Sequence, residues 1–255
     1  MQFHAAADEL RTAGDQHNLA AALSAAGNIS ISLGDYKAAI SDVEQAITLR
    51  QALHENSDLG TDLNNIGRAY YSLGDYPKAL EHYQEALKVD RRQGDLAGEV
   101  TRLNNIGNVH YFLGHYADAF DNYQAALQVV NANTGKRWYP WGLKLSNGNI
   151  ATLYQRLGLE ERALELYRQS SGRPEEMEAS EYAQLLLNQG ILYRRLGDPV
   201  KALEVYQSAQ ALFVFGFFRL RALDAQLVEN LLNSLVVGQR LRIGKLVASL
   251  SNRRK

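Results

Sequence analysis

Apolar residues recur along much of the chain at steps of three and four, which is the spacing of one face of an α-helix. Between residues 63 and 73 this face consists of Leu63, Ile66, Ala69, Tyr70 and Leu73. Gly74 and Asp75 then predict the end of the helix, because glycine adopts the left-handed C-terminal conformation at little cost. Pro77 fits the first turn of a following helix, whose apolar face consists of Ala79, Leu80, Tyr83, Ala86 and Leu87. The stretch therefore predicts a helical hairpin.

This hairpin pattern is repeated. The segment 63–95, LNNIGRAYYSLGDYPKALEHYQEALKVDRRQGD, returns at 103–130 as LNNIGNVHYFLGHYADAFDNYQAALQVV. Glycines in the same register mark five turns, at Gly34, Gly74, Gly114, Gly158 and Gly197. A unit that cannot bury its apolar face alone buries it by stacking on its neighbours. We therefore expect an all-α fold of stacked antiparallel helix hairpins.

The residues at fixed positions of this unit resemble the tetratricopeptide repeat (TPR). In the hairpin that starts at residue 63, the matching positions are Leu63, Gly67, Tyr70, Ala79, Tyr83 and Ala86. The unit is about forty residues long rather than the usual thirty-four. In this respect it is similar to kinesin light chains, LGN-type polarity adaptors and bacterial arrays associated with CHAT proteases. The resemblance covers roughly residues 1–215 and implies a right-handed α-solenoid.

The repeat register predicts the organisation of the chain. We expect a half-repeat helix at 1–15, repeats at 16–55, 56–95, 96–135, 136–173 and 174–215, and C-terminal capping helices at 216–255. The half-repeat fits either an N-terminal cap or a cut from a longer array, and its intact seam residues favour the cut. The last forty residues carry eight basic residues against two acidic ones. A membrane-surface or nucleic-acid patch, or the end of a longer protein, are alternatives for this segment.

Composition narrows the possible partners. The formal net charge is −1, with 27 Lys and Arg against 28 Asp and Glu, so no global field attracts nucleic acid. The chain has no cysteine, which excludes disulfides and thiolate metal sites and fits a reducing compartment. The N-terminus does not resemble a signal peptide, and no apolar run reaches membrane-spanning length. We expect a cytoplasmic protein without a membrane span.

The sequence does not predict catalysis, a cofactor or a metal site. The six histidines form no HExxH motif, and no nucleophile elbow or dinucleotide loop occurs. His110 lies where the other repeats have a tyrosine, so we interpret it as a substitute at the edge of the core. The many carboxylates on the second helices, such as Glu81 and Asp118, fit a solvated face.

One column of asparagines is the strongest functional signal. It lies two residues before the small Gly/Ala position of repeats two to five and consists of Asn65, Asn105, Asn149 and Asn188, while Ala25 interrupts it in repeat one. Asparagine is unfavourable inside helices, so its recurrence calls for a reason. Its amide both donates and accepts hydrogen bonds, which suits an extended peptide backbone. The TPR resemblance implies that asparagine in this column holds a peptide backbone or a terminal carboxylate.

The same predicted groove continues over the following turns of the first helices. Its further candidates are Asn28, Arg68, Asn108, Thr152 and Ile191, and then Tyr71, Tyr111, Phe112, Gln155, Arg156, Arg194 and Arg195. The groove would be aromatic in repeats two and three and basic in repeats four and five. This favours a peptide with an apolar segment followed by acidic side chains or a free C-terminal carboxylate. In the alternative, the asparagines bond to neighbouring helices and the arginines are solvated.

A second aromatic group lies in the connection before repeat four. Trp138, Tyr139 and Trp141 fit either a surface that stacks on a ligand or the cover of a seam between repeats, and the seam is the simpler interpretation.

The leading functional hypothesis is a non-catalytic scaffold that binds a protein or peptide segment in the concave face. Two alternatives stay open. The chain is the sensor or regulatory region of a longer effector, such as a CHAT-type protease or a peptide-responsive regulator, or it assembles with itself through exposed ends.

Overall fold

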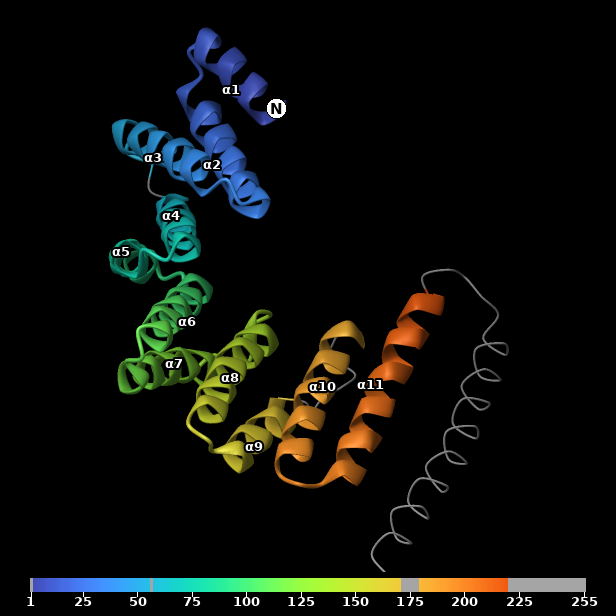
Figure 1. The fold of residues 1–255 in the computed structure, drawn as a ribbon. Helices are drawn as coiled ribbons and strands as arrows, with labels where there is room; N and C mark the ends of the chain where they lie inside the picture. Colours follow the sequence, from blue (N-terminus) through green and yellow to red (C-terminus); the bar gives the residue numbers. More distant parts are fainter. Residues whose placement is uncertain (1, 56, 171–178, 220–255) are drawn as a thin grey trace, which may run out of the picture. The chain divides into compact units, whose positions relative to one another are not determined.

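The computed structural model describes residues 2–55, 57–170 and 179–219, and within these ranges the regular secondary structure is helical (Figure 1). The helices are α1 (Gln2–Ala13), α2 (Gln16–Leu33), α3 (Tyr36–Ala52), α4 (Leu59–Leu73), α5 (Tyr76–Gln93), α6 (Leu96–Phe112), α7 (Tyr116–Asn131), α8 (Tyr139–Arg156), α9 (Glu160–Ser170), α10 (Ala179–Arg195) and α11 (Pro199–Arg219). The expected all-α fold of helix hairpins is confirmed.

The chain forms two compact units, Met1–Gly158 and Leu159–Lys255. In the first unit α2 pairs with α3, α4 with α5 and α6 with α7, and each hairpin packs on the next helix along the chain. The first helices of successive hairpins, α2, α4, α6 and α8, also contact one another in order. In the second unit α10 pairs with α11, and α9 packs on α10.

The hairpin turns follow from local sequence. Gly34 and Gly74 have φ of 82° and 79°, in the left-handed region that favours glycine. The next residue is an aspartate that caps the second helix: the side chain of Asp35 accepts from the backbone N–H of Ala38 at 3.1 Å. Asp75 accepts from that of Lys78 at 3.3 Å. The Gly-Asp pairs therefore end one helix and begin the next.

Two glycine substitutions should have opposite effects on stability. Gly74→Ala should lower the free energy of unfolding by about 1–2 kcal/mol, because alanine is strained at positive φ. Gly148→Ala should raise it by about 0.5–1 kcal/mol, because Gly148 lies inside α8 and an added Cβ would have no neighbour within 4 Å. Urea unfolding of the two variants beside the parent measures both values. A loss of stability in Gly148→Ala would contradict this assignment.

The hairpin core rests on a tyrosine packed over a glycine. The ring of Tyr83 in α5 covers Gly67 in α4, and the ring of Tyr123 in α7 covers Gly107 in α6, in each case where a Cβ would collide with the ring. Tyr83 also belongs to a core cluster that includes Val100 of α6, so one ring serves both its own hairpin and the next one. The small and aromatic positions of the repeat therefore pack against each other within a hairpin.

Two buried ion pairs join successive hairpins. Arg50, near the end of α3, places Nε 2.8 Å from Oδ2 of Asp62 in α4, and both side chains are almost fully buried. Forty residues later the charges are exchanged: Asp90 of α5 lies 3.0 Å from Nε of Arg102 in α6. Burial is the main cause that raises the pKa of both aspartates above the ordinary value. These pairs were not predicted from the sequence.

The connection before α8 covers a seam. Trp138 and Tyr139 are partly buried against the cluster that contains Val130, while Trp141 remains 42% exposed. The simpler interpretation of this aromatic group therefore holds for Trp138 and Tyr139.

Two sequence expectations reach beyond the described residues. The first residues of the repeat expected at 174–215 lie outside them, as does the tail from residue 220 onward. Helix α11 runs on to Arg219, past the expected end of the last repeat at residue 215. Among the described helices, none is both long and apolar enough to cross a membrane.

Candidate functional site

Two of the three predicted asparagines of the first unit, Asn105 and Asn149, donate hydrogen bonds to the neighbouring first helix. Nδ2 of Asn105 in α6 donates to Oδ1 of Asn64 in α4 at 2.8 Å. Nδ2 of Asn149 in α8 donates to Oδ1 of Asn104 in α6, also at 2.8 Å. Nδ2 of Asn104 in turn donates to Oγ of Ser146 at 3.1 Å. These bonds between helices are the ones that the alternative interpretation of the asparagine column expects.

Asn105 and Asn149 nevertheless keep hydrogen-bonding capacity. Both are half-buried, and within the described residues the Oδ1 of each accepts no hydrogen bond. An amide carries two donor hydrogens and an acceptor oxygen, so one bond to a neighbouring helix does not exhaust it. Asn65 differs, because it is only 7% exposed and its Oδ1 lies 3.5 Å from Nη1 of Arg68.

The next column contains side chains that are already engaged. Nη1 of Arg68 donates to Oδ1 of Asn28 in α2 at 3.2 Å. Oδ1 of Asn108 accepts from the hydroxyl of Tyr123 at 2.7 Å. Thr152 is exposed, and its hydroxyl donates to a carbonyl of its own helix at 2.9 Å. Asn28, Thr152 and Ile191 are the exposed members of this column, whereas Arg68 and Asn108 are half-buried.

Five aromatic rings form a continuous surface, the aromatic strip, consisting of Tyr71, Tyr76, Tyr111, Phe112 and Tyr116. The ring centroids of Tyr71 and Phe112 lie 5.5 Å apart, although the residues belong to different repeats. Tyr76 stacks on Phe112 at 5.9 Å, and Tyr111 contacts both Phe112 and Tyr116. Such offset and edge-to-face pairs are favourable ring arrangements. The strip thus spans the α4/α5 and α6/α7 hairpins.

The aromatic strip is exposed and has a positive charge at one end, and both features suit the binding of a ligand. Phe112 is 57% exposed, which is unusual for a large apolar side chain with three ring neighbours so close. Tyr71 is half-buried, and burial followed by the neighbouring tyrosines raises its pKa to about 12, so it stays neutral. At one end of the strip, Nε of the exposed Arg156 donates to the hydroxyl of Tyr116 at 3.1 Å. An apolar surface therefore ends at a fixed positive charge.

Two members of the strip were not predicted from the sequence. Tyr76 and Tyr116 are the first residues of α5 and α7, whereas the predicted groove was assigned to the first helices alone. A signal was present, because a tyrosine follows the turn in three successive repeats, at Tyr36, Tyr76 and Tyr116.

The predicted residues of the second unit have separate surroundings. Asn188 is half-buried, and its Oδ1 accepts from Nε2 of Gln184 at 3.3 Å. Arg194 is exposed, and Nη1 of Arg195 lies 3.8 Å from a carboxylate oxygen of Glu160.

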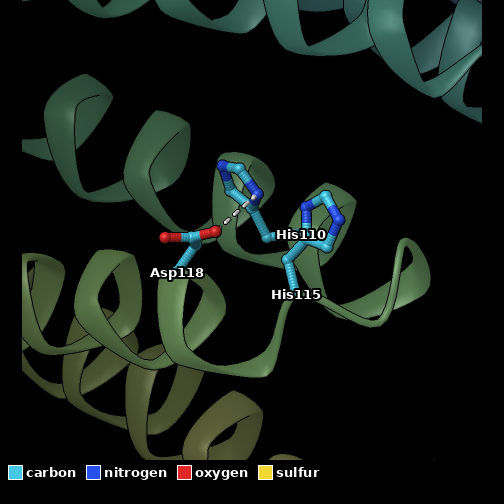
Figure 2. A group of neighbouring side chains, drawn as sticks. All are labelled: His110, His115 and Asp118. Atoms are coloured by element: carbon cyan, nitrogen blue, oxygen red, sulfur yellow. Dashed lines mark ion pairs between the residues drawn. The ribbon is translucent and has the colours of Figure 1, made fainter.

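One group of described side chains has the composition of a metal site. His110, His115 and Asp118 place their ligand atoms within 4.8 Å of one another at the turn between α6 and α7 (Figure 2). From the sequence, no metal ligand was expected at this turn.

Comparison with solved structures shows which folds the chain is similar to. It matches BtubC (BKLC) from P. vanneervenii with a TM-score of 0.70 and 19% identity, covering 88% of this chain and 91% of that one. The apo form of the quorum sensor NprR from B. thuringiensis matches with a TM-score of 0.66 and 15% identity, covering 88% and 66%. The TPR-like repeats of a kinesin light chain of P. anserina match with a TM-score of 0.57 and 18% identity, covering 81% and 95%.

Comparison with protein-family models identifies the family of the chain, which the solved structures at low identity do not. No curated protein sequence matches the chain. One model described as tetratricopeptide repeat matches residues 18–92 and 58–132, and a second with the same description matches residues 149–213. These matches cover most of the helix hairpins described above. The chain belongs to the tetratricopeptide repeat family.

Proposed function

We propose that the first unit is a non-catalytic scaffold that binds an extended segment of a partner protein across the first helices and the aromatic strip. The observation that carries this proposal is the continuous strip of five rings that ends at Arg156. Exposed aromatic surface next to a fixed charge is characteristic of protein-binding sites.

The chemistry of the strip defines the ligand. Apolar side chains of the segment lie against Tyr71, Tyr111 and the exposed Phe112. A carboxylate, either acidic side chain or free C-terminus, pairs with Arg156, because a guanidinium binds carboxylate through two parallel hydrogen bonds. Arg68 offers a second positive charge, although it already donates to Asn28.

The half-buried asparagines add backbone recognition. Asn105 and Asn149 donate one hydrogen to a neighbouring helix, and their free oxygen and second amide hydrogen remain for the peptide groups of the ligand. In this proposal the same amides hold the first helices together and bind the segment. Asn108 and Thr152 contact it at the edge of this row. For Asn65, Asn188, Arg194 and Arg195, the peptide contacts stay predictions.

A similar structure that contains a bound peptide supports a peptide as the ligand. One of the NprR structures similar to this chain is a complex of NprR with its cognate peptide NprX, at a TM-score of 0.58 and 14% identity, covering 90% of this chain and 64% of that one. That likeness is also what favours the second hypothesis, the sensor region of a peptide-responsive regulator. Self-assembly stays a prediction that light scattering over a range of concentrations tests.

Selection from a displayed library of random twelve-residue peptides tests the proposal. We expect the purified chain to enrich peptides with an aromatic or aliphatic segment followed by acidic residues or a free C-terminus. Arg156→Glu should weaken binding of the selected peptides at least tenfold, because it places a negative charge where their carboxylate binds. Phe112→Ser should weaken binding similarly by removing the most exposed ring. Fluorescence anisotropy measures the affinities.

Two matched controls separate this surface from general effects. Arg92→Glu reverses an exposed charge on α5, and Leu33→Ser removes the leucine that is most exposed among the described residues, at the end of α2. Both should bind like the parent. A library that yields no binder, or peptides that bind Arg156→Glu and Phe112→Ser as tightly as the parent, would refute the proposed surface.

A further inference from the structure

Two hairpin turns of this chain are closed by the same three residues. In the α4/α5 turn, the ammonium of Lys78 lies 4.9 Å from the ring centroid of Tyr70 and 3.3 Å from the carboxylate of Asp75. In the α10/α11 turn, Lys201 makes the same contacts with the ring of Tyr193 at 5.7 Å and with Asp198 at 3.0 Å. In both turns the aspartate also accepts from the backbone N–H of the lysine.

The α6/α7 turn replaces all three residues at once. Forty residues after Tyr70, Asp75 and Lys78 the chain has His110, His115 and Asp118, within the repeat that otherwise follows its predecessor most closely. Each replacement introduces a side chain that binds metal ions. Random divergence would scatter changes over the surface of the repeat, whereas these three changes fall at one turn and all introduce metal-binding side chains.

The three side chains converge on one point. His110 lies in the last turn of α6, His115 precedes α7 and Asp118 lies in its first turn, and Figure 2 shows the two imidazoles and the carboxylate grouped at the turn. The ring centroids of His110 and His115 are 6.0 Å apart. Nδ1 of His110 is 3.9 Å from Oδ2 of Asp118, too far for a hydrogen bond.

The protein alone leaves these groups poorly satisfied. Nδ1 of His110 is buried and has no hydrogen-bond partner among the described residues. His115 occupies the cap position of α7 but makes no side-chain cap bond, unlike the aspartates that cap α3 and α5. A buried nitrogen without a partner is costly, and a lost cap weakens a helix start. A bound ligand would give the buried Nδ1 of His110 the partner that it lacks.

We propose that His110, His115 and Asp118 bind a divalent transition-metal ion, with zinc as the best match. Two imidazole nitrogens and one carboxylate oxygen are a common zinc ligand set, in which water completes the coordination. The chain contains no cysteine thiolates to compete for the ion. Zinc bonds of about 2.0–2.2 Å bring tetrahedral ligand atoms to roughly 3.3 Å from one another. The ligand atoms here must therefore move closer than their present spread of 4.8 Å, and His115 and Asp118 are exposed and free to rotate.

The ion would connect the end of α6 to the start of α7 beside the aromatic strip. Tyr111 and Tyr116 are the immediate chain neighbours of His110 and His115. Zinc therefore takes over the closing role that lysine has in the α4/α5 and α10/α11 turns, and it fixes the turn that carries two of the five rings.

Calorimetric titration of the untagged full chain with zinc chloride tests this proposal. We expect one zinc ion per chain, and a Co²⁺ complex with the visible absorption of a tetrahedral or five-coordinate site. His115→Asp and Asp118→Lys restore the residues of the α4/α5 turn, so both variants should fold, and each should weaken zinc binding at least tenfold. In the absence of metal, His115→Asp should melt no lower than the parent, because it regains a helix cap.

The control is His54→Asn, which removes an exposed histidine at positive φ, where asparagine is tolerated. It should bind zinc like the parent. No binding by the parent, equal binding by the parent and both restored variants, or an equal loss in His54→Asn would each overturn the proposal.

Discussion

Asp62→Ala is expected to lower the free energy of unfolding by about 3–5 kcal/mol, because it leaves the charge of Arg50 buried without its main partner. The side chain of Arg50 is 3% exposed and that of Asp62 1%. Oδ1 of Asp62 also accepts from the hydroxyl of Ser24 at 2.6 Å, so the substitution removes a second bond. Asp58 keeps its contact with Nη1 of Arg50 at 2.9 Å, which favours the lower half of that range.

The unfolding measurement has to separate local from global unfolding, because the chain is a repeat array. A repeat array can unfold in parts, so a single transition is not guaranteed. Urea unfolding should therefore be combined with hydrogen exchange of α3 and α4, where the loss of protection should concentrate. Unchanged protection at this seam in Asp62→Ala would contradict the expectation.

The double variant Arg50→Leu, Asp62→Ala is the informative control. Replacing a buried pair by apolar residues is often neutral or stabilising, so we expect this variant within about 1 kcal/mol of the parent. The chain contains a natural precedent, because Val130 and Ser146 occupy the same two places in α7 and α8, and both are uncharged and buried. The raised pKa of Asp62 is consistent with this expectation, because it shows that burial disfavours the ionised carboxylate in the folded state. The contribution of Asp62 to stability is therefore present at low pH and is lost as the pH rises through the folded-state pKa.

We therefore expect the two ion pairs to contribute more to the order in which the repeats stack than to the free energy of unfolding. Arg50 faces Asp62 at one seam, and Asp90 faces Arg102 at the next, with the charges exchanged. Stacking α3 directly on α6 would bring Arg50 against Arg102 in a buried seam, which is strongly unfavourable. Because the two seams carry their charges in opposite order, a stack that skips the second repeat is disfavoured. Without this difference the second and third repeats, whose sequences match closely, could replace each other.

Tyr123→Ala is the second substitution with a large expected effect, a loss of about 3–5 kcal/mol. The ring is 2% exposed and fills the space over Gly107, which has no side chain to expand into the cavity. The hydroxyl donates to Asn108 at 2.7 Å, so the core residue also holds a side chain of the proposed binding surface. Tyr123→Phe isolates this bond and should cost about 1 kcal/mol. Thermal and urea unfolding measure both.

Tyr83 provides a matched comparison in the preceding hairpin. Its ring covers Gly67 in the same way, but within the described residues its hydroxyl makes no hydrogen bond. Tyr83→Phe should therefore be nearly neutral, whereas Tyr123→Phe should not. Equal effects of the two Phe variants would show that the bond to Asn108 contributes nothing.

The sequence by itself determined the helices, their order and the turns between them. These depend on short-range physics: apolar residues at steps of three and four, glycine at positive φ, and aspartate at the helix start. Repetition extended the result, because a pattern seen in one hairpin, such as Gly67 with Tyr83, predicts the equivalent contact at Gly107 and Tyr123. The family resemblance depends on these same positions.

Only the tertiary structure decided which side chains forty residues apart meet. Asn105 reaches Asn64 rather than Asn65, Tyr71 reaches Phe112, and Arg50 reaches Asp62. Sequence periodicity places a residue on a face of its helix, but these contacts depend on the rotation and crossing of one helix against the next, which the summed packing of the whole seam sets. The convergence of His110, His115 and Asp118 is of the same kind, since the turn geometry brings together residues that their spacing alone did not connect.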